Sequence, residues 1–95
     1  MLQFAWNPEK AKRNLLKHGV GFAEASSVFG DPLAREIDDP LHSVEESRSV
    51  LIGNSDRRQL LVVVYAEPEP DSVRIISARR ATPQERRNHE DRERS

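Results

Sequence analysis

The spacing of hydrophobic positions predicts a short strand and two helices at the start of the chain. Residues 2–6 show the alternating pattern of a short strand. Asn7 then provides an N-cap, and Pro8 suits the first position of a helix that ends at Gly19. This helix has a mainly apolar stripe of Ala11, Leu15 and His18 and an adjoining basic stripe of Lys10, Arg13 and Lys17. A shorter helix over residues 22–29 is broken by Gly30-Asp31-Pro32.

The middle of the chain predicts an antiparallel sheet. Residues 33–38 form a weak strand, a candidate for a sheet edge, and a polar loop follows. Residues 48–54 alternate, and residues 60–65 are apolar throughout, as in a central strand that is covered on both faces. Residues 73–78 alternate again and place Arg74 on the side opposite its apolar neighbours.

The last segment predicts a helix with almost nothing to bury. Thr82-Pro83-Gln84-Glu85 has the pattern of a capping box. Beyond it the His89 ring is the one exception in an otherwise entirely polar helix, so we expect fraying over about residues 88–95 without a partner. The sequence therefore predicts one domain, residues 1–95, of the α+β class: a strand and two helices, then an antiparallel β-meander and a C-terminal helix.

Composition narrows the kind of site. A chain of 95 residues with 36% hydrophobic residues has a thin core, so we expect a shallow surface site. Cysteine is absent and the three histidines lack the spacing of a zinc site, so we expect no metal and no cofactor. The longest apolar run is far too short for a membrane span, and the N-terminus lacks a signal-peptide pattern. We therefore expect a cytoplasmic protein with no membrane partner.

Charge is segregated although the total is only −1. Residues 1–20 and 74–95 each carry a net charge of +3, whereas residues 21–47 carry −6 and residues 67–73 carry −3. If the two basic ends share a face, that face can bind a polyanion such as RNA.

Arginines are the strongest candidates for chemistry on RNA. Cleavage without a metal needs a base for the 2′-hydroxyl, an acid for the leaving oxygen and cations for the charge that develops on the phosphate. Guanidinium groups stay charged and bind phosphate through two parallel hydrogen bonds. Arg79 ranks first because it follows directly from a strand, and Arg48, Arg74 and Arg80 are further candidates.

Other candidates have structural alternatives. His18 could transfer a proton, but it could equally be a packed residue at a helix end. Lys10 and Lys17 could be solvated helix residues. Trp6 could stack on an RNA base or pack against the first helix.

The order of these segments resembles the BrnT toxin family across nearly the whole chain. The likeness rests on Phe4-Ala-Trp-Asn-Pro-Glu-Lys10, Lys17-His-Gly-Val20, Arg74-Ile-Ile-Ser-Ala-Arg-Arg-Ala-Thr82 and Glu85-Arg-Arg87. The matching positions are Trp6, Lys10, Lys17, His18, Gly19, Phe22, Phe29, Arg48, Gly53, Ser77, Arg79, Ala81 and Glu85. His89 stands where the family commonly has tyrosine.

The resemblance implies a compact RelE-like fold and a metal-independent endoribonuclease that inhibits translation. It implies neutralisation by a BrnA-like antitoxin in a hetero-oligomer, with operator DNA bound only through that antitoxin. We expect a catalytic set and an RNA-binding set. The catalytic set is Arg79, Arg48, Lys17 and Trp6, and the RNA-binding set is Lys10, Arg13, His18, Arg74 and Arg80.

Two other functions fit parts of the sequence. A non-catalytic module could use the basic ends to bind nucleic acid or a partner chain. A small DNA-binding regulator fits less well, because the chain lacks helix-turn-helix spacing and a helix rich in base-reading side chains.

Overall fold

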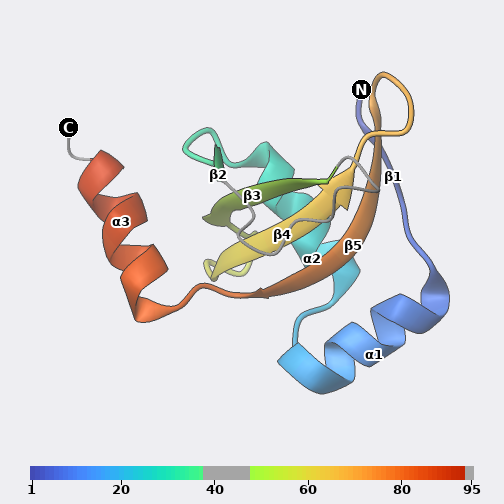
Figure 1. The fold of residues 1–95 in the computed structure, drawn as a ribbon, viewed down its shortest axis with the longest axis horizontal. Helices are drawn as coiled ribbons and strands as arrows, with labels where there is room; N and C mark the ends of the chain where they lie inside the picture. The colour runs from blue at the N-terminus through green and yellow to red at the C-terminus, as the bar shows by residue number, and fades with distance from the viewer. Residues whose placement is uncertain (38–47, 94–95) are drawn as a thin grey trace.

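The computed structural model describes residues 1–37 and 48–93 and confirms the predicted α+β plan (Figure 1). Its elements are β1 (Gln3–Ala5), α1 (Pro8–His18), α2 (Phe22–Ser27), the 3-10 turn η1 (Val28–Gly30), β2 (Arg35–Ile37), β3 (Ser49–Asn54), β4 (Leu60–Ala66), β5 (Ser72–Arg80) and α3 (Pro83–Glu93). The polar loop expected between residues 38 and 48, and residue 38 of the predicted strand, lie outside the described residues.

The strands form one five-stranded sheet in the order β1-β5-β4-β3-β2. Strands β2 to β5 make the predicted antiparallel meander, and β4 is the central strand. Strand β1 pairs in parallel with the first part of β5, a pairing that the hydrophobic pattern did not indicate. The register between β4 and β5 shifts at Val64 and Tyr65, so that Ile76 is an extra residue in β5.

The sheet has two distinct faces. The first face carries the larger core, which α1 and α2 cover through residues such as Ala11, Phe22 and Ala25. The second face carries a smaller cluster of Val50, Ile52, Leu60 and Val62, with Ile37, Val64 and Ala81 packed against it. Gly53 permits close packing beside β3, because a Cβ atom there would lie 2.7 Å from Ala34 Cβ.

Helix α1 is attached to the sheet by a buried polar side chain. Asn7 caps the helix and Gly19 ends it in the left-handed conformation, both as predicted. Asn14 is 7% exposed. Its amide nitrogen donates to the carbonyl oxygens of Val20 (2.9 Å) and Ala78 (2.8 Å), and its amide oxygen accepts from the Ala78 backbone N–H (3.1 Å).

These bonds set the rotation of α1 and correct the predicted stripe. Ala11 and His18 are half-buried as expected, but Leu15 is 53% exposed, because Asn14 occupies the position that faces the sheet. Backbone groups of β5 that lie beyond its pairing with β1 would otherwise lack partners in the interior. An asparagine satisfies both a donor and an acceptor there, which a leucine cannot do.

Helix α3 lies beside the second face, at the opposite end of the molecule from α1 (Figure 1). The prediction that this helix buries nothing is wrong at His89, which is 3% exposed. The fraying of its final turn stays a prediction. Because α1 and α3 lie apart, the two basic ends of the chain do not combine into the single basic face that the charge pattern suggested.

The Asn14 attachment predicts a large stability effect. Asn14→Ala removes three hydrogen bonds and leaves Ala78 backbone groups buried without partners, so it should lower the free energy of unfolding by about 2 to 4 kcal/mol. Urea unfolding would measure this. Asn88→Ala, at an exposed asparagine of α3, is the control and should stay within about 0.5 kcal/mol of wild type. Equal midpoints for wild type and Asn14→Ala would contradict the assignment.

Candidate functional site

Two arginines mark the ends of one row of residues across the second face. Arg79 of β5 is opposite Val62 of β4, Val62 is opposite Ile52 of β3, and Ile52 is opposite Arg35 of β2. Cross-strand partners project from the same side of a sheet, so the row spans three strand spacings, about 14 Å. The two arginines thus lie at either end of a row whose middle residues, Val62 and Ile52, are apolar.

A groove lies between the Arg35 end of this row and α3. It has a volume of about 450 Å³ and is lined by Arg35, Ile37, Ile52, Glu85, Asn88, His89, Asp91 and Arg92. The groove brings the His89 imidazole to the same cavity as the Arg35 guanidinium. Two isoleucines form its apolar part, and the other lining residues are polar or charged.

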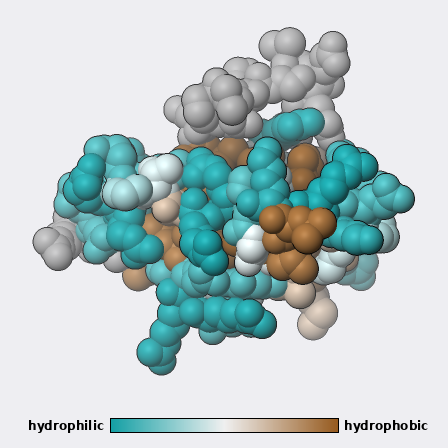
Figure 2. All heavy atoms as spheres, turned by 90° about the horizontal axis from the view of Figure 1, so that it is seen from below, coloured by the Kyte–Doolittle hydropathy of each residue, from teal (hydrophilic) through white to brown (hydrophobic). Residues whose placement is uncertain are grey.

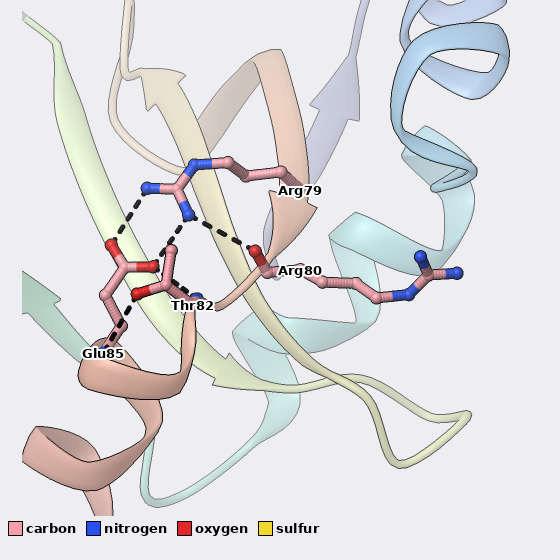
Figure 3. Close-up of polar contacts among 4 residues, drawn as sticks. All are labelled: Arg79, Arg80, Thr82 and Glu85. Carbon is pink, nitrogen blue, oxygen red and sulfur yellow. Dashed lines mark hydrogen bonds and ion pairs between the residues drawn. The ribbon is translucent and has the colours of Figure 1, made fainter.

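Arg79 is held by a two-pronged ion pair with Glu85 of α3. Its Nη1 donates to Glu85 Oε1 at 2.7 Å and its Nη2 to Oε2 at 2.9 Å. Arg79 Nη1 also donates to the backbone carbonyl of Arg80 at 3.3 Å. Figure 3 shows the two charged groups facing each other, while the Arg80 side chain points away. Arg79 and Glu85 are both among the positions that carry the family resemblance described above. Their contact with each other was not predicted.

Glu85 also caps the N-terminus of α3. The Thr82 backbone N–H donates to Glu85 Oε1 at 2.8 Å, and the Glu85 N–H donates to Thr82 Oγ1 at 3.1 Å, which confirms the predicted capping box. The bond to Arg79 is the main reason that the pKa of Glu85 is lowered from 4.5 to about 2. The same bond raises the pKa of Arg79. The guanidinium is therefore charged and fixed in orientation.

Arg80 belongs to the other side of the sheet. Its Nε donates to Gln59 Oε1 at 2.8 Å, and Gln59 Nε2 donates to Glu24 Oε2 at 2.9 Å. Ser55 Oγ donates to the same Glu24 oxygen at 2.7 Å. Arg80 Nη2 lies close to Gly19, since a Cβ atom built there would be 3.6 Å away. This chain of bonds directs Arg80 toward the end of α1.

The structure divides the predicted site residues into two groups. Arg74 and Arg79 project from the second face, where they pair with Ala66 and Val62, and Arg48 precedes β3 in the phase of Val50. The α1 side holds Trp6, Lys10, Arg13, Lys17, His18 and Arg80. The predicted catalytic set is therefore not brought together, because Lys17 and Trp6 lie on the α1 side and Arg79 lies beside α3.

Individual residues on the α1 side also have defined surroundings. Trp6 is 36% exposed, and its ring lies edge-on to Phe22 with centroids 6.0 Å apart. It therefore packs on α2 and still presents surface to solvent. Arg13 forms an exposed ion pair with Glu9 at 3.6 Å, a type of contact that adds little stability.

Arg35 and His89 are the groove residues that the sequence analysis missed as site candidates. Arg35 falls in a weak strand of an acidic segment, and only the strand register shows that it shares a row with Arg79. His89 had one available signal, its position as the single ring in a polar helix.

Within residues 1–37 and 48–93, no three histidine, aspartate or glutamate side chains lie together so as to hold a metal ion. No helix in these ranges is long and apolar enough to cross a membrane.

A family model and a solved structure that match this chain both belong to one family. Residues 6–85 match the family model described as the ribonuclease toxin BrnT of type II toxin–antitoxin systems. The fold is similar to the crystal structure of the Brucella abortus ribonuclease toxin BrnT, with a TM-score of 0.66 and 20% sequence identity over 86% of this chain and 99% of that one. A search of curated proteins finds no match to the sequence.

The Arg79–Glu85 pair predicts a pH-dependent contribution to stability. Because the folded pKa of Glu85 is depressed to about 2, the contribution is complete above the ordinary value of 4.5 and is lost as the pH falls toward 2. At pH 7, Glu85→Gln should cost about 1 to 2 kcal/mol, allowing for the partial exposure of Arg79.

The measurement is urea unfolding of wild type and Glu85→Gln from pH 7 to pH 2, where their difference should shrink below pH 4.5. Glu90→Gln on the exposed side of α3 is the control and should stay within about 0.5 kcal/mol of wild type at pH 7. A difference that stays constant down to pH 2 would rule out this contribution.

Proposed function

The chain belongs to the BrnT family of ribonuclease toxins of type II toxin–antitoxin systems, and from this premise we propose that it cleaves RNA in the groove between α3 and the second face. The observation that supports this site most directly is the row from Arg79 to Arg35, with His89 of α3 beside it. The reaction proposed is metal-independent endonucleolytic cleavage.

The groove residues and the neighbouring Arg79 suit attack by the 2′-hydroxyl of RNA. In this reaction the 2′-oxygen loses its proton and bonds to phosphorus, the bond from phosphorus to the 5′-oxygen breaks, and that oxygen gains a proton. Arg79 and Arg35 would stabilise the charge on the phosphate oxygens. His89 lines the groove and carries an imidazole, the side chain that most often transfers protons in catalysis. Glu85 would position Arg79 without contacting RNA.

The remaining predicted residues are assigned to binding. Arg48 and Arg74 project from the second face and would contact phosphates beside the scissile one. Lys10, Arg13, Lys17 and Arg80 would hold a flanking stretch of the strand on the α1 side. Trp6 could stack on a base there, and His18 would serve binding. Lys17 and Trp6 are thus moved from catalysis to binding.

The partners proposed are an RNA substrate and a BrnA-like antitoxin encoded by a neighbouring reading frame. The toxin would act in the cytoplasm, where it would inhibit translation and growth. Operator DNA would be bound only through the antitoxin in the hetero-oligomer. Neutralisation would work by covering surfaces that bind RNA.

One observation favours a non-catalytic role for Arg79. Its two Nη atoms are both engaged by Glu85, which is also how a purely structural arginine would look. The two roles differ in how Arg79 and Glu85 variants compare. A structural arginine predicts equal losses from Arg79→Ala and Glu85→Gln, whereas a catalytic arginine predicts a much larger loss from Arg79→Ala.

The first functional prediction concerns the groove. Arg79→Ala and His89→Gln, expressed from a tightly controlled promoter, should relieve growth arrest at protein levels equal to wild type. Purified variants should cleave RNA at least about 10²-fold more slowly, because each loses a group that acts in the transition state. Arg87→Gln is the control, since Arg87 is exposed on α3 and bonds to Gln84, and its cleavage rate should be unchanged. Equal arrest from all the variants would remove the groove from the mechanism.

The second functional prediction concerns the chemistry. Purified protein should cleave RNA in excess EDTA and leave 2′,3′-cyclic phosphate or 3′-phosphate ends. The measurement is gel analysis of an end-labelled RNA, with end-specific enzymatic treatment of the products. Activity that is abolished by EDTA and restored by Mg²⁺ would show that the proposed mechanism is wrong, as would products with 3′-hydroxyl ends.

A further inference from the structure

Two adjacent leucines of α1 are held in solvent. Leu15 is 53% exposed and Leu16 is 80% exposed. Figure 2 shows an apolar patch beside hydrophilic residues on the side of the molecule where α1 lies. A single exposed leucine is common on protein surfaces. Two large apolar side chains exposed on one helix concentrate apolar surface there, which is a feature of binding sites.

The fold maintains this exposure through Asn14. Successive residues of a helix are rotated by about 100°, so Leu15 and Leu16 project about 100° and 200° from the buried asparagine. Rotating α1 to bury Leu15 would break three hydrogen bonds that join Asn14 to Val20 and Ala78. The exposure of the leucines is therefore a consequence of the buried Asn14 contact. Burying them by rotation of the helix would cost the free energy of those hydrogen bonds.

Charge beside the leucines limits what can bind them. Helix α1 contains four basic residues and one acidic residue, a net charge of +3. Lys12 lies between the leucines on the helix surface, and Arg13 and Lys17 lie along one flank. A second copy of this chain docked on the same patch would oppose two such basic surfaces, at an electrostatic cost. An apolar segment with acidic neighbours is complementary in both respects.

We propose that Leu15 and Leu16 form the docking site for an apolar, acidic segment of the antitoxin. This inference rests on the proposed function, which supplies the antitoxin as the partner. The leucines fill apolar positions of that segment, and its carboxylates pair with Lys12, Arg13 and Lys17. Because Arg13 and Lys17 also bind RNA in the proposed function, docking on the leucines excludes RNA from α1 without contact with the groove.

The test replaces both leucines and measures binding. Leu15→Ser/Leu16→Ser should weaken the affinity for the antitoxin, the product of the neighbouring reading frame, by about 100-fold or more in isothermal titration. Leu33→Ser is the matched control, because Leu33 is also 53% exposed and lies outside α1; its affinity should match wild type. Both variants should retain the RNA cleavage rate and melting temperature of wild type, since all three side chains are exposed.

In cells, the double variant should arrest growth even when the antitoxin is co-expressed, whereas Leu33→Ser should be neutralised. An unchanged affinity in the double variant would overturn the proposal. Sedimentation of the toxin alone tests the other occupant: a concentration-dependent dimer that the double variant abolishes would assign the patch to a second copy. Failure of the ribonuclease assignment would appear separately, as a wild-type protein that binds its neighbour's product but does not cleave RNA.

Discussion

The Arg79–Glu85 ion pair is the contact on which the candidate site depends. Helix α3 has almost no apolar side chains, so little else directs it to the second face apart from the buried His89 ring. The pair joins the end of β5 to the first turn of α3 through two short hydrogen bonds. Its geometry fixes the wall of the groove, and the groove brings Arg35 and His89 together.

Both flanking helices reach the sheet through polar groups. Asn14 attaches α1 and the Arg79–Glu85 pair attaches α3, while most of the buried hydrophobic residues lie in the strands. In a chain with few hydrophobic residues, this leaves the sheet well packed and the outer surfaces of the helices largely polar. Polar attachments also require specific geometry, because a misplaced amide or guanidinium loses its partners. They define the placement of a helix more narrowly than an apolar stripe does.

The sequence was sufficient for the elements and their class. Periodicity and caps located the helices around Asn7, Gly19 and Thr82, and the unbroken apolar run identified β4 as central. Which residues of different strands share a face of the sheet could not be predicted in this way. That Arg35 shares a row with Arg79 depends on three strand registers, and each register is a long-range property. Asn14 was missed because an apolar residue is the usual choice for a buried helix position, and the pattern offered Leu15 instead.

The extra residue in β5 decides which of its arginines contacts α3. Arg74 and Arg79 are an odd number of residues apart, so an uninterrupted strand would point them to opposite sides. The register shift after Ile75 reverses the alternation, and both then project from the second face. Removing one residue there would leave the strand intact and exchange Arg80 for Arg79 beside α3. The identity of the arginine that contacts α3 thus depends on the number of residues in a strand, which neither a substitution scan nor a comparison of residue types would detect.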